Sequence, residues 1–374
     1  MQRQLRNNIR NMLGWRTDRR IMVIESDDWG SVRMPSQQAF KRLEEAGLDL
    51  ISRDAERYSR YDTLASVSDL TNLFEVLSGV RDIHNRPCAF TPMSIMANPD
   101  FDRIRKDNFN VYHYELFTDT LQRYKGCEKA FDLWKQGIRE QVFIPQLHGR
   151  EHLNVQAWMK GLQSGDKQTM LAFDEGVWSF IPAPDAFNPS GYLAAFELFD
   201  PAEIDYQRTV IKEAAEIFEK LFEYKAEVFV PPNSKYNNSL NVTLLENGIK
   251  FKDAARKQME SLGNGKTRTV YNLRQKSRSG VWYLFRNAFF EPNQPGKEWV
   301  SSCMNDIENA FRWKKPAIIS SHRTNFIGGL DEKNRDSSLM QLKELLYSIQ
   351  KRWSDIEFMT SAELGNLMKN ETDN

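Results

Sequence analysis

Short apolar runs rich in β-branched and aromatic residues alternate along the chain with longer stretches whose apolar positions recur every three to four residues. The short runs predict strands, and the longer stretches predict amphipathic helices. We expect strands at Arg20–Ser26, Pro87–Ala97, Gln141–Leu147, Ala226–Val230, Gly248–Phe251, Pro316–Ser321 and Asp355–Thr360. We expect helices at Leu70–Val80, Ala130–Glu140, Arg208–Tyr224, Asp306–Trp313 and Ser338–Lys351.

Alternation of strands and helices predicts parallel strands and an α/β fold. Seven strands favour an incomplete or deformed barrel, although periodicity alone also allows a doubly wound sheet. We expect one barrel domain over residues 20–365, a helical extension over 1–19 and a flexible tail over 366–374. Two long stretches, near 153–207 and 258–298, interrupt the alternation of predicted strands and helices. They are typical of insertions that cover an active site.

The composition excludes several classes of protein. Lys+Arg and Asp+Glu both number 51, so no net charge steers the chain to nucleic acid or membranes. Three scattered cysteines form no disulfide framework or zinc ribbon. The start of the chain has no apolar run of a secretory signal, and no segment reaches the ~20 apolar residues of a membrane span. We expect a cytoplasmic protein of unspecified oligomeric state, while the basic residues before position 21 leave contact with an anionic membrane surface open.

Three groups of polar residues directly follow predicted strands. They are Ser26–Gly30 (SDDWG), His148–His152 (HGREH) and His322–Asn325 (HRTN). In parallel β/α folds, the loops after the strands open on one face, where functional side chains gather. We therefore expect these three groups to meet in one site although they are far apart in the sequence.

These residues predict a metal centre. His148 and His152 are four apart, so on a helical turn they would share one face. Asp27 and Asp28 are adjacent carboxylates that repel each other unless a cation relieves them. One carboxylate and two imidazoles suit Zn²⁺ first, and also Fe²⁺, Co²⁺, Ni²⁺ or Mn²⁺. The second carboxylate can act as general base on water, and His322 as general acid. Surface histidines and a helix N-cap remain the non-functional alternatives.

Two of these segments resemble motifs of the polysaccharide deacetylase (NodB-homology) family. The apolar strand that ends in SDDWG resembles the first motif, in which the first aspartate is the base and the second binds metal. The resemblance implies that Asp27 is the base and Asp28 a ligand. LHGREH resembles the second motif, which implies that His148 and His152 are the other ligands.

The resemblance extends to the end of the chain. IISSH resembles the family's later strand, whose histidine protonates the leaving amine, which implies this role for His322. The segment IEFMTSAEL resembles the final strand and helix. The order of motifs spans residues 20–365 and implies the family's deformed (β/α)₇ barrel, in a diverged bacterial-type member.

The sequence also departs from the family pattern. Gly149 stands where the second motif has a hydroxyl residue, and Val230 precedes Pro231 and Pro232 where an arginine tethers the catalytic aspartate. Another cation would have to supply that tether, and the candidates are Arg150, Arg286 and Arg323. Asp253 is the candidate for the aspartate that orients the catalytic histidine.

The implied reaction is hydrolysis of an N-acetyl group on an amino sugar or glycan precursor. The metal would polarise the carbonyl and activate water, with Asp27 as base and His322 as acid. We expect substrate contacts from Trp29, Pro232 and Asn233. Arg286 and Arg323, which are also tether candidates, are expected to contact the substrate as well. Four further aromatic residues are candidate sugar platforms, although core packing explains each of them better: Trp178, Tyr236, Trp282 and Tyr283.

Two alternatives remain at this stage. His148, Glu151 and His152 also match the inverzincin metalloprotease pattern, which needs a continuous helix and would make Glu151 the base. Pro145 and Gly149 disfavour such a helix. A barrel that binds glycans without turning them over is the second alternative, because the tethering arginine is missing from its usual place.

Overall fold

One main sheet of nine strands organises the computed structural model, which describes residues 8, 10–52, 54–188 and 190–373. Every strand pair in this sheet is parallel. Eight strands follow one another across it, and β13 (Ile356–Phe358) pairs with the start of β1. In spatial order the eight are β10 (Trp282–Leu284), β7 (Phe251–Asp253), β6 (Val228–Phe229), β5 (Gln146–Gly149), β2 (Phe90–Ile95), β1 (Arg20–Trp29), β12 (Ala317–His322) and β11 (Ala288–Phe289).

Within the described residues the end strands β10 and β11 do not pair with each other, so the sheet forms an incomplete barrel. The predicted α/β fold with a deformed β/α barrel is therefore confirmed, and all seven predicted strands lie in the sheet. The structure adds β10 and β11, which have three and two residues and lie inside the stretch 258–298 that the sequence predicts as an insertion. Strands this short leave no periodic pattern to detect.

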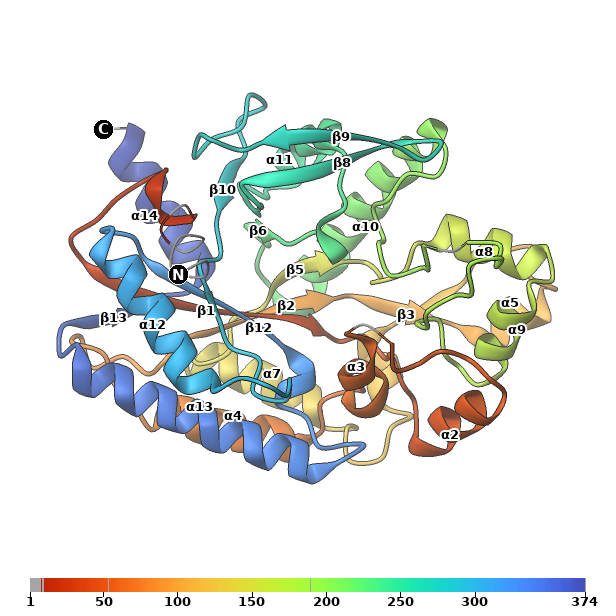
Figure 1. Cartoon of the computed structure of the whole chain (residues 1–374), viewed down its shortest axis with the longest axis horizontal. Coiled ribbons are helices and arrows are strands. Elements are labelled where there is room, and N and C mark those ends of the chain that lie inside the picture. The colour runs from red at the N-terminus through yellow and green to blue at the C-terminus, as the bar shows by residue number, and fades with distance from the viewer. Residues whose placement is uncertain (1–7, 9, 53, 189, 374) are drawn as a thin grey trace.

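Helices cover the sheet because its strands are apolar on both faces. In β1, every residue from Ile21 to Trp29 is buried, as in parallel sheets packed on both sides. Four helices lie in a row along one side of the sheet (Figure 1). They are α4 (Val67–Ser78), α7 (Ala130–Arg139), α12 (Trp299–Arg312) and α13 (Glu332–Arg352). With α10 (Ile204–Phe222), which contacts β5, they account for the five predicted helices.

Four of the predicted helices begin earlier than their apolar periodicity indicates, and in α4 a polar cap sets the start. In α4, the side chain of Ser66 accepts from the backbone of Asp69, whose carboxylate accepts from the backbone of Ser66. This capping box starts the helix three residues before the predicted start.

The remaining elements lie outside this frame. A second hydrophobic cluster around Trp158, Phe173 and Trp178 holds together the stretch 153–207 and the segment after β1. Two small antiparallel sheets, β3–β4 and β8–β9, are separate from the main sheet, and Figure 1 shows the β8–β9 hairpin at the top of the view. The bounds are α2 (Gln37–Glu45), α3 (Ala55–Tyr61), β3 (Ala97–Pro99), α5 (Phe101–Lys106), β4 (Tyr114–Leu116), α6 (Phe117–Leu121), α8 (Val155–Gln163), α9 (Lys167–Asp174), α11 (Asn241–Glu246), β8 (Lys257–Gly263), β9 (Lys266–Tyr271) and α14 (Ser361–Asp373).

The two chain ends differ in how they relate to the predictions. Of the helical extension predicted over 1–19, residues 1–7 and 9 lie outside the described residues. The segment 366–373, predicted as a flexible tail, continues α14, because Met368 is buried in a hydrophobic cluster with Trp282 and Leu364. Nowhere in the described part of the chain does a helix combine the length and apolar character that crossing a bilayer requires.

Candidate active site

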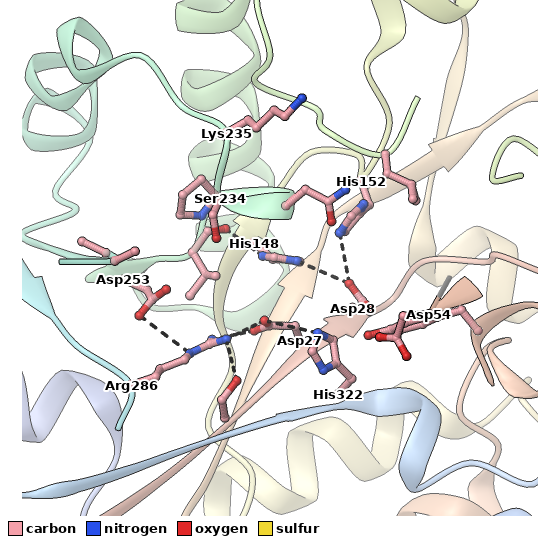
Figure 2. Close-up of a pocket in the computed structure, with 18 of the residues that line it drawn as sticks. Asp27, Asp28, Asp54, His148, His152, Ser234, Lys235, Asp253, Arg286 and His322 are labelled. Carbon is pink, nitrogen blue, oxygen red and sulfur yellow. Dashed lines mark hydrogen bonds and ion pairs between the residues drawn. The ribbon is translucent and has the colours of Figure 1, made fainter. Parts of the chain in front are cut away.

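A cavity of about 1090 Å³ opens at the carboxyl ends of the parallel strands. The three polar groups that follow β1, β5 and β12 all reach it, and Figure 2 shows their side chains pointing toward one another. The stretch 153–207 contributes Ser179–Pro182 to the wall, and the stretch 258–298 contributes Tyr271, Leu273, Phe285, Arg286 and Phe289. Both predicted insertions therefore line the cavity.

A β-bulge at the end of β1 turns both aspartates into the cavity. Adjacent residues of a regular strand face opposite sides, so one of the two carboxylates would normally point away. The register of β1 against β2 shifts between Ser26 and Trp29, and Asp28 has a φ of 76° in the left-handed region. Bulges of this kind re-aim side chains at the edge of a site. Asp27 and Asp28 consequently both line the cavity.

The two histidines meet across a turn rather than on one face of a helix. His148 belongs to β5, while His152 lies in the loop before α8. Between them Gly149 has a φ of 143°, and a Cβ there would lie 3.1 Å from the carbonyl oxygen of Glu151. A side chain is strained in this conformation, which explains the glycine in place of a hydroxyl residue. The predicted convergence holds, but its expected helical geometry is wrong.

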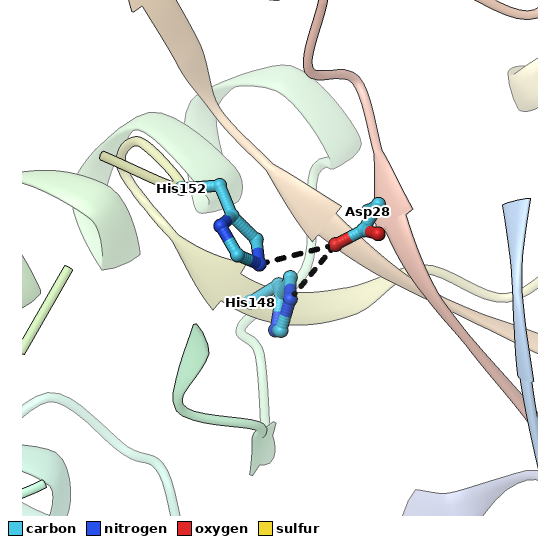
Figure 3. Close-up of side chains that lie close together, drawn as sticks. All are labelled: Asp28, His148 and His152. Carbon is cyan, nitrogen blue, oxygen red and sulfur yellow. Dashed lines mark ion pairs between the residues drawn. The ribbon is translucent and has the colours of Figure 1, made fainter. Parts of the chain in front are cut away.

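Asp28, His148 and His152 form a buried group that could hold a metal ion (Figure 3). Oδ1 of Asp28 lies 3.2 Å from Nε2 of His152 and 3.4 Å from Nε2 of His148. Nδ1 of His148 is 2.7 Å from the carbonyl oxygen of Val230 and can only donate to it. That bond fixes the tautomer and leaves Nε2 as a free lone pair facing Asp28.

The chemistry of these donors fits a divalent ion. Nε2 of His148 is buried and has no hydrogen-bond partner among the described residues. Burial, together with the charge of Arg33, lowers the pKa of His152 to about 4 and outweighs the opposing effect of Asp28. The imidazole is therefore neutral at physiological pH, as a metal ligand must be. One carboxylate and two imidazoles leave coordination positions open for water or substrate.

Arg33 is an additional cation beside the ligands that the sequence did not indicate. Its Nη2 atom lies 3.1 Å from Oδ2 of Asp28 and 3.5 Å from Nε2 of His152, and its Nε atom lies 3.3 Å from Oδ2 of Asp62. The guanidinium donates to Oδ2 of Asp28, while Oδ1 faces the two imidazoles. Arg33 thereby orients Asp28 for single-oxygen coordination.

Asp27 is tethered by Arg286, one of the three candidates from the sequence. Nη1 and Nη2 of Arg286 each lie 2.6 Å from a carboxylate oxygen of Asp27, and its Nε is 2.6 Å from Glu25. Burial alone would raise the pKa of Asp27, but the guanidinium outweighs burial and holds this pKa below its usual range. Asp27 is therefore an ionised carboxylate that could accept a proton.

His322 lies opposite Asp27 in the register of β1 and β12. Its Nε2 is 3.9 Å from Oδ2 of Asp27, and its Nδ1 is 2.6 Å from Oε1 of Glu291. Burial disfavours the imidazolium, but Glu291 outweighs this and raises the pKa of His322. Glu291, and not the predicted Asp253, therefore orients this histidine.

Asp253 lines the cavity on the other side of Arg286, with its Oδ1 3.8 Å from Nε of that arginine. Burial raises the pKa of Asp253 to about 7, even though Arg286 opposes the rise. This carboxyl group contacts the tether of Asp27 rather than His322. The contact with Arg286 is enough to explain why Asp253 lies in the site. Asp253 does not orient His322.

Several residues expected at the substrate do not reach the cavity. Trp29 is 1% exposed and packs against Phe90 and Phe143 in the core. Arg323 is fully buried and donates to Asp62, so it neither contacts substrate space nor tethers Asp27. Pro232 is buried behind the wall, whereas its neighbour Asn233 lines the cavity.

Arg150, the third tether candidate, also lies away from Asp27. It donates to Glu151 at 2.6 Å and pairs with Glu213 and the hydroxyl of Tyr206. Glu151 is thereby buried in its own ion pair outside the cavity lining, and the segment from His148 to His152 is a strand end and a loop. The helix that the inverzincin pattern requires is absent from this described segment.

The aromatic lining of the cavity differs from the four predicted platforms. Each of those four is at most 5% exposed and lies outside the lining of the cavity. The aromatic residues that do line it follow other strands and loops, and they are Tyr58, Phe180, Tyr271, Phe285 and Phe289. Three of the four, Tyr236, Trp282 and Tyr283, are therefore core residues, and Trp178 stacks beneath His152.

Comparison with known proteins gives structural matches alone. No protein-family model and no curated protein matches the sequence. A 4-alpha-glucanotransferase from Thermococcus litoralis matches 92% of this chain at 12% identity with a TM-score of 0.44, and this chain spans only 40% of that one. A protein from Mycobacterium smegmatis assigned as a polysaccharide deacetylase matches 96% of this chain and 93% of its own, at 9% identity and a TM-score of 0.45. A family 4 acetyl xylan esterase from Clostridium thermocellum, in complex with a cobalt ion, matches 93% and 91% at 11% identity and a TM-score of 0.37.

Proposed function

We propose that this protein is a metal-dependent hydrolase that removes an N-acetyl or related acyl group from an amino sugar or glycan precursor. The observation that carries the proposal is that two separate functional groups share one cavity. Asp28, His148 and His152 form a possible ligand set. Beside it lie Asp27, whose lowered pKa favours the ionised carboxylate, and His322, whose raised pKa favours the protonated imidazole. The motif resemblance of these same five residues supports the assignment.

Asp28, His148 and His152 would hold the ion, with Zn²⁺ as the first expectation and Co²⁺, Ni²⁺, Fe²⁺ or Mn²⁺ as alternatives. A divalent ion at this position supplies a Lewis acid that polarises the acyl carbonyl and activates water. The carbonyl oxygen of Val230 and the guanidinium of Arg33 keep two of the ligands in place. Ligands held in this way are preorganised before substrate arrives.

Asp27 and His322 would carry the protons. Asp27 accepts a proton from the attacking water, whose oxygen forms the new bond to the acyl carbon. His322 donates a proton to the amine nitrogen as the carbon–nitrogen bond breaks. The products are acetate and the free amino sugar, so water is consumed and no other reactant is needed. The ion pairs to Arg286 and Glu291 hold the two groups in the protonation states that these steps require.

The direct test is acyl release by the zinc-loaded protein from a panel of N-acetylated sugars. We expect acetate and free amine in equal amounts. Glu151→Gln serves as the control that separates this proposal from an inverzincin protease, because Glu151 lies outside the cavity in its pair with Arg150. A Glu151→Gln protein that loses activity while it keeps its metal and its stability would contradict the assignment. Absence of acyl release from every sugar tested would instead favour a glycan-binding barrel without turnover.

The pH dependence should report the pair formed by His322 and Glu291. An acid must be protonated to act, so activity falls as pH rises through the pKa of His322, which Glu291 raises above its usual value. Glu291→Gln removes this effect, and the alkaline fall in kcat/KM should move to lower pH. The acid limb should stay in place, because Asp27 is governed by burial and by Arg286.

Asn325 offers a matched control for that experiment. Its amide donates to Glu291 at 2.8 Å from the side opposite His322, and it carries no charge. Asn325→Asp would place a second carboxylate beside Glu291, whereas Asn325→Ala removes hydrogen bonds to Glu291 and three other neighbours without changing the charge. We expect Asn325→Ala to shift the alkaline limb far less than Glu291→Gln does. An alkaline limb that stays unchanged in Glu291→Gln would show that His322 is not the group whose titration limits activity.

A further inference from the structure

The wall of the cavity carries more positive than negative side chains. Six lining residues are arginine or lysine and four are aspartate, with no glutamate among them. A bound divalent ion would add further positive charge. The basic residues are Arg10, Arg33, Lys235, Arg256, Lys257 and Arg286, and the acidic ones are Asp27, Asp28, Asp54 and Asp253.

Two of these cations lack the acidic partner that three of the others have. Arg286 and Arg33 are paired with Asp27 and Asp28, and Lys235 lies 2.6 Å from Glu197. Arg256 and Lys257 form no ion pair with any carboxylate in the part of the chain that the structure describes. Arg256 and Lys257 are therefore two neighbouring cations of the cavity wall whose charge no carboxylate of the described residues offsets.

Arg256 is held in place in a way that leaves its charge unmatched. Its Nη2 donates to the carbonyl oxygen of Leu13 at 2.5 Å and its Nη1 to that of Asn272 at 3.2 Å, while its Cζ lies 3.5 Å from the centroid of the Phe285 ring. Burial lowers the pKa of Arg256 to about 10, because no anion offsets the loss of water. A partly desolvated cation without a counter-charge gains more than an exposed one when an anion arrives.

The position of the pair fits a substituent near the reacting group. Arg256 and Lys257 follow Asp253 by three and four residues, and Asp253 lies against the tether of Asp27. An extended chain advances at most about 3.6 Å per residue, so both backbones lie within about 15 Å of that of Asp253. This span is comparable to a sugar unit with its substituent.

An aromatic and apolar surface adjoins the two cations. Lys257 pairs with Tyr271 in the register of the β8–β9 hairpin, so both side chains lie on the same face of it. Tyr271 is 63% exposed and Leu273 is 57% exposed, yet both line the cavity. The hairpin therefore offers a cation and an aromatic side chain at paired positions, a combination suited to a charged sugar derivative.

We infer that Arg256 and Lys257 form a subsite for an anionic group, a phosphate or a carboxylate, carried by the acylated amino sugar away from its acyl group. The inference rests on the proposed function for the identity of the reacting end. It specifies the substrate class as a negatively charged N-acyl amino sugar rather than a neutral polymer. The subsite acts on binding and not on the chemical step.

The test compares three probes that share the same acyl group. They are methyl N-acetylglucosaminide, which is neutral, N-acetylglucosamine 1-phosphate, and N-acetylmuramic acid, which carries a carboxylate. We expect kcat/KM to be higher for at least one anionic probe than for the neutral one, and which probe wins identifies the anion. Arg256→Gln and Lys257→Gln should each raise KM for that probe by roughly 10- to 100-fold. Neither change should alter kcat, or KM for the neutral probe.

Two controls keep the inference separable from folding and from the proposed function. Lys266→Gln removes an exposed cation of the same hairpin that does not line the cavity and should change nothing. The Arg256 side chain donates to two backbone carbonyl oxygens, so Arg256→Gln could unfold the protein. Lys257→Gln removes no such bond and therefore tests the subsite independently. Equal kcat/KM for all three probes, or an anionic preference that survives both substitutions, would overturn the subsite. If no probe is hydrolysed, the proposed function fails, and calorimetric binding of N-acetylglucosamine 1-phosphate then tests the subsite. Weaker binding by Lys257→Gln than by the unaltered protein supports the subsite. Equal binding by the two proteins overturns it.

Discussion

Asp27→Asn should lower kcat by roughly 10²- to 10⁴-fold while the protein keeps its metal. Asparagine has nearly the shape of aspartate but cannot accept the proton of the attacking water. The ligand atoms belong to Asp28, His148 and His152, so the ion should remain bound. Steady-state acyl release gives the loss in rate, and elemental analysis of the same preparation gives the metal content.

Asp28→Asn is the matched variant, because it makes the same exchange of one carboxylate oxygen for an amide nitrogen in the adjacent residue. It should lose metal as well as activity, since Asp28 supplies the oxygen that faces both imidazoles. The two neighbours are thus expected to separate into a base and a ligand. Retained activity in Asp27→Asn, or loss of metal from both variants alike, would contradict this division of roles.

Arg286→Gln should destabilise the protein by about 3–5 kcal/mol and reduce its activity, because it breaks a buried ion pair from one side. Glu25 is fully buried, and Asp27 and Asp253 are nearly so, and all three carboxyl groups would lose their shared cation. The pKa of Asp27 should rise without the guanidinium, since Arg286 is the main group that opposes the effect of burial. A base must be deprotonated, so the acid limb of kcat/KM should move to higher pH. Urea unfolding measures the first effect and a pH–rate profile the second.

Arg286→Lys separates charge from geometry in this tether. Lysine keeps the positive charge but cannot make the two parallel bonds of 2.6 Å that fix both oxygens of Asp27. We expect it to retain more stability than Arg286→Gln and a smaller shift of the acid limb, with kcat still below that of the unaltered protein. If Arg286→Gln leaves both the stability and the acid limb unchanged, Arg286 is not the group that sets the ionisation of Asp27.

The convergence of the site could be predicted because it depends on long strands. β1 and β12 have continuous buried patterns, and their parallel pairing places Asp27 opposite His322 whatever the loops do. The metal ligands follow from the same rule, since β5 ends at the same edge of the sheet. These parts of the site are fixed by the direction and order of the strands.

The supporting residues could be predicted only in part, because they follow strands too short to recognise: Arg286 is one of three candidate tethers, and Glu291 is not indicated by the sequence. Arg286 lies between β10 and β11, and Glu291 comes two residues after β11, which is only two residues long. Glu291 does stand behind a short apolar run, Ala288–Phe290, which is the same kind of position that identified the other site residues. That run lies inside a predicted insertion, so the sequence does not identify it as a strand of the main sheet.

The error over Trp29 has a different physical origin. In a regular strand, Trp29 would share a face with Asp27 and would point into the cavity. The bulge at Asp28 changes this alternation, and the indole is turned into the core, where its Nε1 donates to Ser26 at 2.9 Å. Backbone irregularities of this kind depend on tertiary contacts, so hydrophobic patterning along the chain does not reveal them.

The measurement that tests the central claim most directly is titration of metal-stripped protein with Zn²⁺, followed at the same time by bound metal and by acetate release. We predict no release without metal, and activity that rises in proportion to bound zinc and saturates at one ion per chain. His148→Ala and His152→Ala should neither bind this ion nor gain activity. Full acetate release from protein freed of divalent ions, or normal zinc binding in both histidine variants, would contradict the account.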